Sequence, residues 1–305
     1  MRKLLSANFF SMIHAKRFWL GCVFMIGAPL MDVISTRRMM AQYTDSTTTL
    51  DSVLIHCTPW LFILLPCVCG LFINTDYHDG TIRNKLTVGR SRTSVYMSNL
   101  ITLYIVALFY LALAEISVLI AGAGIPIQDP GYIVRQMLLL VLLFLALTAM
   151  AVFAATMITN RSALVVCALV GLGMMFGGQL VNDLLSNEPE IPDYQGVVFE
   201  TGENGMQVMK YLDKDGKAVD FEDIAMIPNP NYVAEPLRSV LRTANQINPG
   251  GQLWEILRDG HQEFDSDGNP MRVNPPAWQL ALYSLGVAAG FTLLGLVLFG
   301  KKDLK

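Results

Sequence analysis

The fold is decided by a long apolar stretch, residues 133–184. It reads IVRQMLLLVLLFLALTAMAVFAATMI over 133–158, TNRS over 159–162, and ALVVCALVGLGMMFGGQLVNDL over 163–184. A helix needs about 20 mostly apolar residues to cross the hydrocarbon core of a membrane, which is roughly 30 Å thick. Both long runs meet that length. Because only the TNRS tetrapeptide separates them, they predict neighbouring transmembrane helices joined by a tight hairpin.

Four further windows have the same character, so the sequence predicts six transmembrane helices. They cover about residues 18–34, 53–73, 100–121 and 277–299. Composition agrees, because 53% of the 305 residues are hydrophobic and only 15% are charged, against roughly 25% in soluble domains. Pro59 and Pro66 should kink the second helix. The expected fold class is an all-α polytopic membrane protein whose first helix is not cleaved as a signal peptide.

The basic residues are divided unevenly between the two ends of these helices, which predicts the orientation of the chain. Cytoplasmic flanks and short loops carry the excess of Lys and Arg. One set of flanks holds Arg2, Lys3, Lys16, Arg17, Arg83, Lys85, Arg90, Arg92, Arg161, Lys301, Lys302 and Lys305, and the opposite short loops hold Arg37, Arg38 and Arg135. We therefore expect a multi-pass plasma-membrane protein with both termini in the cytoplasm and residues 185–276 outside the cell.

The polar segment 185–276 predicts a small extracellular domain of mixed α and β structure. Residues 206–212 and 217–221 flank an Asp- and Gly-rich turn at 213–216, a pattern typical of a β-hairpin. Helices are predicted over 233–247 and 252–258, separated by the Asn-Pro-Gly-Gly break at 248–251. The expected divisions are 1–184 (an N-terminal helix and transmembrane helices 1–5), 185–276 (the extracellular domain) and 277–305 (transmembrane helix 6 and a cytoplasmic tail).

The first sixteen residues predict a separate amphipathic helix. Leu5, Phe9, Met12 and Ile13 recur at near-helical spacing, with basic residues on both sides. Such a helix is expected to lie in the inner membrane interface. The alternative is that these residues simply extend the first transmembrane helix inward.

The loop after the second helix carries the most informative pattern, NTDYHDGTIRNKLTVGRSR over 74–92. It predicts a short cytoplasmic helix over about 79–88, in which Ile82 and Leu86 share one face and which Gly89 can end. The residues expected to matter in this segment are Asp76, Asp79, Gly80, Thr81, Ile82, Arg83, Lys85 and Leu86. Taken by itself, the pattern also fits an ordinary basic loop on the cytoplasmic side.

Seven residues in and around this loop follow a spaced pattern: Phe72, Asp76, Tyr77, Gly80, Thr81, Ser91 and Arg92. The pattern resembles that of ABC-2 type transporter permeases, especially bacterial peptide, bacteriocin-immunity and drug exporters. Those permeases carry an aromatic residue, an acidic–aromatic pair, Gly-Thr and a coupling helix that closes on Ser-Arg. Asp76 departs mildly, because the family usually has Glu there. The six-helix layout, the N-terminal helix and the basic tail at 299–305 are also similar.

The resemblance implies a transport subunit driven by a separate ATPase chain. ATP and Mg²⁺ would be held by that partner, whose closure would move the permease through the coupling helix, with Ile82 and Leu86 docking on the partner. This sequence has no G-x-x-x-x-G-K-[ST] phosphate loop, so no enzymatic activity, cofactor or metal is expected of it. Expected partners are the ABC ATPase subunit, a second permease subunit in a homodimer or heterodimer, and membrane lipids, but not nucleic acid.

The expected function is export of a hydrophobic or amphipathic peptide, lipid or drug, but other functions stay open. Glu115 lies inside the third apolar window, where a carboxylate is costly and marks a candidate polar site, or a hydrogen-bonded glutamate near the outer helix end. It gives thin support to an ion-coupled secondary transporter. A membrane sensor with an extracellular ligand-binding domain is the other alternative. Two G-x-x-x-G pairs predict close helix contacts within or between subunits: Gly173 with Gly177, and Gly286 with Gly290.

Overall fold

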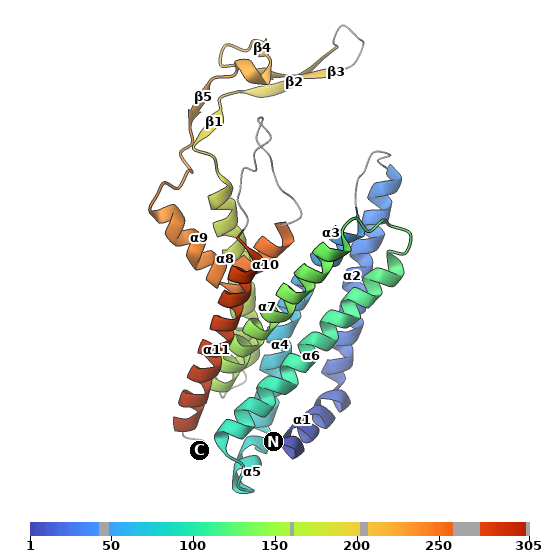
Figure 1. The fold of residues 1–305 in the computed structure, drawn as a ribbon, viewed down its shortest axis with the longest axis vertical. Helices are drawn as coiled ribbons and strands as arrows, with labels where there is room; N and C mark the ends of the chain where they lie inside the picture. Colours follow the sequence, from blue (N-terminus) through green and yellow to red (C-terminus); the bar gives the residue numbers. More distant parts are fainter. Residues whose placement is uncertain (43–48, 159–161, 202–206, 259–274, 303–305) are drawn as a thin grey trace. The chain divides into compact units, whose positions relative to one another are not determined.

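The structure, a computed structural model (Figure 1), describes residues 1–42, 49–158, 162–201, 207–258 and 275–302. It contains two compact units. One comprises Met1–Gln179 together with Ala244–Lys305, and the other comprises Leu180–Thr243. We call the first the membrane unit and the second the strand unit.

Six helices in the described chain are long and apolar enough to cross a membrane. They are α2 (Lys16–Gln42), α4 (Thr58–His78), α6 (Arg92–Ala121), α7 (Pro130–Met157), α8 (Ala163–Ser186) and α11 (Ala277–Lys301). The prediction of a mostly helical chain with six transmembrane helices is confirmed, and the chain is a multi-pass membrane protein. Residues 159–161, in the expected hairpin between α7 and α8, lie outside the described residues.

The second crossing is broken near one of the two prolines that predicted a kink. The short helix α3 (Leu50–His56) ends one residue before α4 begins, and Cys57 lies between them. Pro59, in the first turn of α4, lacks a backbone N–H and its ring crowds the carbonyl four residues earlier, in α3. Pro66 lies within α4. One proline therefore ends a helix, and the other is accommodated inside one.

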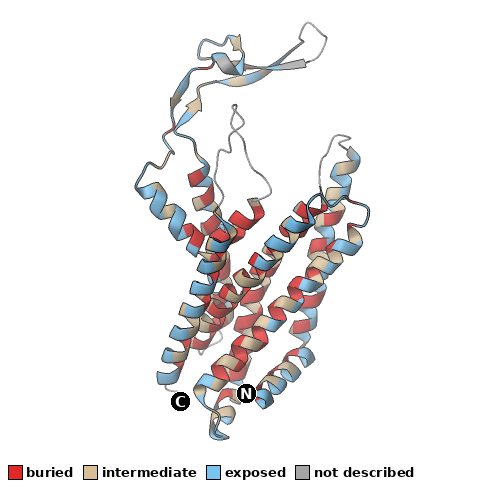
Figure 2. Ribbon diagram, viewed as in Figure 1, coloured by how far each residue is buried: buried red, intermediate tan, exposed pale blue. Residues whose placement is uncertain are grey.

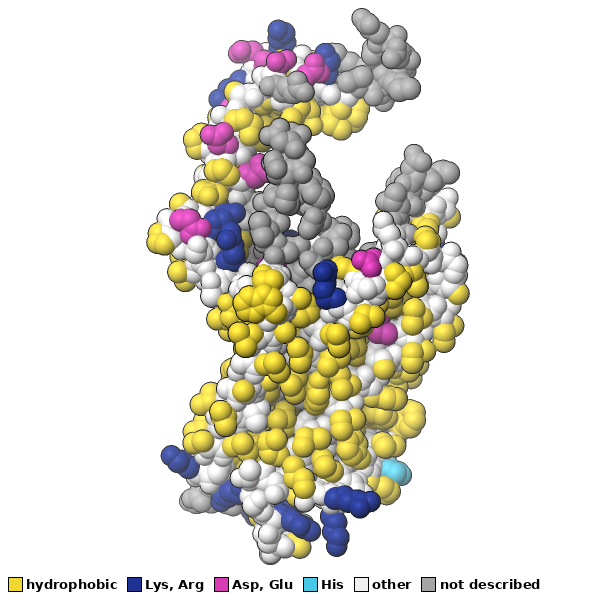
Figure 3. All heavy atoms as spheres, in the orientation of Figure 1, with side chains coloured by type: hydrophobic (Ala, Val, Ile, Leu, Met, Phe, Trp, Pro, Cys, Tyr) yellow, Lys and Arg dark blue, Asp and Glu magenta, His cyan; other side chains and the backbone are white. Residues whose placement is uncertain are grey.

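Helices α4 and α7 form the centre of the membrane unit. α7 packs against α4, α6 and α11, and α4 also packs against α2. The side chains of Phe62 and Phe144, one from each central helix, are fully buried, and Figure 2 shows the buried residues on the inner faces of the helices. On the face drawn in Figure 3, apolar side chains cover most of this unit, and Lys and Arg gather at the end that holds both termini. Such a continuous apolar surface suits contact with lipid.

The helices of the membrane unit approach one another at glycines that differ from the expected ones. A Cβ built on Gly171 of α8 would come within 2.8 Å of the Pro66 ring, and one on Gly70 of α4 would come within 3.0 Å of the Leu164 backbone. Within the described structure, none of the four glycines of the expected pairs has such a neighbour within 4 Å: Gly173, Gly177, Gly286 and Gly290. The expected G-x-x-x-G pairs therefore leave open helix faces, and α4 meets α8 through Gly70 and Gly171.

The N-terminal residues form a helix of their own, α1 (Arg2–His14), which ends at the extended residue Ala15 before α2 begins. The buried residues of α1 are Leu4, Asn8 and Met12, and α1 packs on α6. Of the apolar residues predicted to share one face, Met12 is buried but Ile13 is exposed. The break at Ala15 means that α1 is not a straight continuation of α2.

The strand unit holds two small antiparallel sheets. β1 (Glu190–Pro192) pairs with β5 (Met226–Pro228), and β2 (Gly196–Thr201), β3 (Gln207–Leu212) and β4 (Ala218–Val219) form a meander, followed by the 3-10 helix η1 (Phe221–Asp223). The expected hairpin is present, because Leu212 pairs with Ala218. Gly216, in its turn, has a φ of 74°, which glycine adopts without strain.

Two helices, α9 (Leu237–Ile247) and α10 (Pro249–Arg258), follow the strands. The predicted four-residue break between them is wrong, because only Asn248 separates the two helices. Proline suits the first position of a helix, where its missing N–H has no intrahelical partner to lose. α10 belongs to the membrane unit and packs against α3 and α7, although it falls within the segment 185–276 that was expected to form an extracellular domain.

Candidate coupling site

The short helix α5 (Thr81–Thr87) lies between α4 and α6, at the end of the bundle that holds both termini (Figure 1). Glycines set it off from its neighbours: Gly80 before it has a φ of 67° and Gly89 after it a φ of 81°. Residues other than glycine rarely adopt this left-handed backbone conformation. Ser91 then caps α6, where its Oγ accepts a hydrogen bond from the Ser94 N–H at 3.2 Å. The predicted short helix is therefore present.

The apolar face of α5 points into this chain's own core. Ile82 is only 2% exposed, and Leu86 is partly buried against the same cluster of core residues. The predicted docking of these two side chains on a partner does not fit their burial. The apolar pair instead anchors α5 to the core of its own chain.

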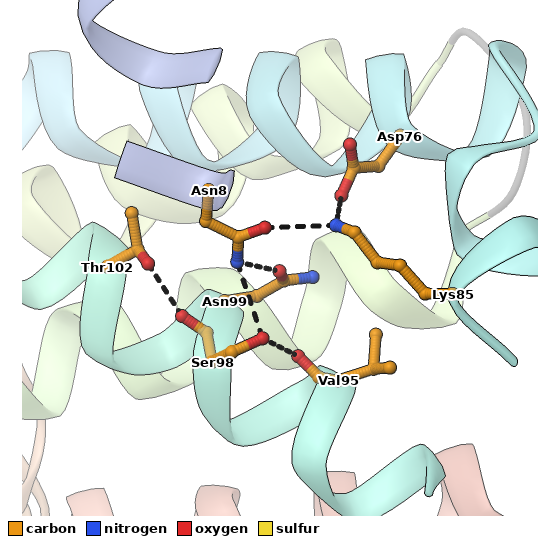
Figure 4. Close-up of polar contacts among 7 residues, drawn as sticks. All are labelled: Asn8, Asp76, Lys85, Val95, Ser98, Asn99 and Thr102. Carbon is orange, nitrogen blue, oxygen red and sulfur yellow. Dashed lines mark hydrogen bonds and ion pairs between the residues drawn. The ribbon is translucent and has the colours of Figure 1, made fainter. Parts of the chain in front are cut away.

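A buried ion pair fixes α5 to the end of α4. Nζ of Lys85 lies 2.7 Å from Oδ2 of Asp76, and the two side chains are 11% and 10% exposed. The same ammonium group donates a second hydrogen bond, to Oδ1 of Asn8 at 3.0 Å. Figure 4 shows Lys85 reaching between the two acceptors. An ion pair taken out of water stabilises a structure only when its remaining hydrogen bonds are also made, and here a second bond is made.

Asn8 links this pair to α6. Its side chain is buried, and its Nδ2 donates to Oδ1 of Asn99 at 2.8 Å and to Oγ of Ser98 at 3.3 Å. Ser98 in turn donates to the Val95 carbonyl, and the Thr102 hydroxyl donates to the Ser98 carbonyl (Figure 4). Four helices, α1, α4, α5 and α6, are thus joined by one buried polar network. The sequence analysis did not single out Asn8, although a polar residue on the otherwise apolar side of a helix can indicate a buried hydrogen bond.

The opposite face of α5 is open. Arg83, Asn84 and Thr87 are exposed, and Val88 directly after the helix is 77% exposed. Asp79, just before the helix, is also largely exposed and lies 3.3 Å from the His78 ring nitrogen. The structure therefore brings Asp76, Lys85, Ile82 and Leu86 together inside, and leaves Arg83 and Asp79 outside.

A second polar cluster fixes the C-terminal end of α11 beside this site. Arg92 donates to the carbonyls of Phe299 and Gly300, both at 3.2 Å, and also to that of Lys302. Lys302 donates to the Thr156 carbonyl at 2.5 Å, and Tyr77 donates to the same oxygen at 2.9 Å. Burial lowers the pKa of the Lys302 ammonium. Tyr77 and Arg92, two residues of the predicted pattern, therefore tie α4 and α6 to the ends of α7 and α11.

Glu115 lies apart from the coupling site, towards the other end of α6. Its Oε1 accepts a hydrogen bond from the Cys57 thiol at 3.5 Å, and its Oε2 is buried with no partner in the described structure. On the facing helices, Trp60 donates to Asp32 at 2.8 Å. The predicted intramembrane polar position therefore has one weak bond and one unmatched oxygen.

Comparison with known proteins identifies the family of the chain. No curated protein matches it closely enough to inform this assignment. The model of the ABC-2 family transporter proteins matches residues 5–177, which include α1, the buried network and α5. Membership implies that an ABC ATPase subunit works with the chain. More than half of the sequence is matched, and the chain therefore belongs to the ABC-2 transporter family, as the membrane permease of an ABC transporter.

Proposed function

We propose that this permease is the export subunit of an ATP-driven transporter for hydrophobic or amphipathic peptides, lipids or drugs. In this proposal the ATP site, with its Mg²⁺, lies entirely on the ATPase subunit, and both termini and α5 lie in the cytoplasm. The gathering of Lys and Arg at that end of the membrane unit (Figure 3) supports the orientation, because cytoplasmic flanks carry the excess of basic residues. The strand unit would then lie outside the cell.

The observation that carries the proposal is the two-sided character of α5. Its inner face is fixed by Ile82, Leu86 and the Lys85–Asp76 pair, whereas its outer face offers Arg83 and the bare Val88 side chain. A protein interface buries an apolar centre inside a polar rim, and an exposed apolar side chain near a cation suits that arrangement. We infer that Val88 enters an apolar pocket of the ATPase and that Arg83 meets an acidic rim.

The buried network would make α5 move together with the membrane helices. A displacement of α5 would be transmitted to α4 through Asp76, and to α1 and α6 through Asn8. α4 packs against α2, α6 and α7, so displacement of α4 would shift the centre of the membrane unit. Coupling in this sense requires an element with two arrangements that both sites bias. The second arrangement would be the one stabilised by ATPase closure.

A second permease subunit completes the proposal. The open glycine faces of α8 and α11, at Gly177 and Gly290 for example, leave room for another helix to approach closely. A homodimer and a heterodimer would both use such faces. Substrate would pass between the two subunits.

The test of the docking face is a pair of matched substitutions. Val88→Asp should weaken capture of the ATPase subunit by the solubilised permease at least tenfold, because the carboxylate would enter an apolar pocket unpaired. Thr93→Asp places the same charge on an exposed position in the first turn of α6, where acidic residues are tolerated, and should leave capture unchanged. Capture at the wild-type level by both variants would contradict the docking face. Capture that fails for both would point to a general effect of negative charge at this end.

A further inference from the structure

The three-stranded sheet of the strand unit has an exposed apolar face. Residues that lie opposite each other in paired strands point to the same side of a sheet. Val197 pairs with Tyr211, and Phe199 pairs with Met209. Val197, Phe199 and Met209 are 41%, 63% and 48% exposed. An antiparallel sheet commonly packs its apolar face on a core and leaves its polar face in water, whereas this sheet leaves its apolar side open in the described structure.

Aromatic rings extend this apolar face beyond the strands. The ring centroid of Tyr211 lies 5.1 Å from that of Tyr194, which precedes β2, and 5.4 Å from that of Phe221 in η1. Tyr194 and Phe221 are themselves exposed. A contiguous exposed apolar surface marks a site of contact with protein or membrane. We call this surface the aromatic face, and its residues are Tyr194, Val197, Phe199, Met209, Tyr211 and Phe221.

The charged side chains of the sheet gather away from the aromatic face. Lys210 follows Met209 in β3 and points to the other side, because successive side chains of a strand alternate. At the nearby turn, Lys214 forms an ion pair with Asp193. Over the strands β2, β3 and β4, Figure 3 shows apolar side chains along one side and Lys, Asp and Glu along the other. The sheet is therefore amphipathic.

Short connections hold this sheet close to the end of a membrane-crossing helix. α8 ends at Ser186, and Tyr194 follows eight residues later. A chain spans at most about 3.5 Å per residue, so Tyr194 lies within about 28 Å of that helix end. The returning chain is fixed at the same place, because the side chain of Asn229 donates to the Glu188 carbonyl and its backbone N–H donates to the Pro189 carbonyl, both at 2.9 Å. The aromatic face is thus kept within reach of the membrane surface.

We propose that the aromatic face rests on the membrane surface, with its side chains in contact with lipid at the boundary between headgroups and acyl chains. Tyrosine is enriched at this boundary, because its ring is apolar and its hydroxyl group stays hydrated. Acidic residues outnumber basic ones over residues 185–229, so the contact depends on apolar surface and suits uncharged lipid. The same acidic excess disfavours a second copy of this unit as the occupant, because like charges repel.

The test compares neighbouring residues on opposite sides of β3 in the full chain. Met209→Cys and Lys210→Cys each carry an NBD fluorophore in phosphatidylcholine vesicles, and wild-type chain labelled in parallel gives the background from its five natural cysteines. Part of the lipid in both leaflets bears a nitroxide quencher on its acyl chain, so the direction of insertion does not affect the result. We expect the fraction of emission quenched to be at least threefold larger at Met209 than at Lys210. The difference should persist in high salt, because salt screens charge but not apolar contact.

Phe199→Cys and Val198→Cys repeat the comparison in β2, so that misfolding of one variant leaves the other pair to decide. Three results would overturn the proposal. Weak lipid quenching on both sides of the sheet, with strong quenching by aqueous iodide, would place the aromatic face in water. Protection from lipid and iodide, with self-quenching that dilution by unlabelled chain relieves, would mean that a second copy covers this face. Protection from both without self-quenching would mean that another protein segment covers it.

Discussion

Lys85 Nζ and Asp76 Oδ2 lie 2.7 Å apart with about nine-tenths of each side chain buried, and this contact joins α5 to α4. Removing one member of such a pair leaves a buried charge with no counter-charge. Removing both members together leaves no charge behind. The relationship therefore predicts opposite outcomes for single and double substitutions.

Lys85→Met should lower the free energy of unfolding by about 3 kcal/mol, the order found when one partner of a buried ion pair is removed. Lys85→Met combined with Asp76→Leu should regain at least half of that loss. Thermal unfolding of the purified permease in detergent measures both. Lys3→Met, at an exposed position of α1, is the control and should have no effect. A double variant no more stable than the single would show that the pair does not hold α5.

Asn8→Ala should destabilise the permease by roughly 1–3 kcal/mol, because it leaves buried polar partners on α5 and α6 without their hydrogen bonds. It should also reduce the substrate moved per ATP hydrolysed, since α1 would no longer follow α5. Unfolding temperature and the transport-to-hydrolysis ratio in proteoliposomes are the two measurements. Ser11→Ala, at an exposed position of the same helix, should leave both unchanged. An unaltered ratio in Asn8→Ala would remove α1 from the coupling proposal.

Gly250→Ala should be strongly destabilising, because its Cβ would overlap the Met174 carbonyl of α8 and the two backbones would have to separate. Gly177→Ala is the matched control. It lies in α8 with open space around the new methyl group within the described structure, so it should be neutral or slightly stabilising, since alanine favours helix over glycine. The yield of monodisperse protein on size exclusion and its unfolding temperature decide the matter. Similar behaviour of the two variants would contradict the close contact between α8 and α10.

The six membrane helices were predictable because length and apolarity alone determine them. The short helix α5 was predictable too, since Gly80 and Gly89 mark its ends. What the sequence could not settle was which way α5 faces. Ile82 and Leu86 share one side of the helix in either orientation, and only the packing of α4 and α6 around them decides that this side is buried.

The polar contacts between residues far apart in the chain could not be predicted from the sequence either. Asn8 and Asn99 are 91 residues apart, and no local pattern links them. The G-x-x-x-G pairs could not be assigned to a contact for a similar reason, because this spacing reports small residues but not which helix, if any, lies beside them within the chain. The Asn-Pro-Gly-Gly segment at 248–251 has the composition of a loop, and tertiary contact with Met174 makes it the start of a helix instead.

The last prediction concerns Glu115 and separates ATP-driven export from proton-coupled transport. In a proton-coupled carrier this carboxyl group would have to gain and lose a proton in every cycle, so Glu115→Gln should abolish transport. In the ATP-driven mechanism its present contact is a hydrogen bond from Cys57 to Oε1, and the nearly isosteric amide oxygen can accept the same bond. We therefore expect the Glu115→Gln permease, reconstituted with its ATPase subunit, to transport within a few-fold of wild type. Transport by both should persist when an ionophore collapses the pH gradient. Loss of transport on collapse of the gradient, with ATP still present, would contradict the ATP-driven mechanism and favour coupling to protons.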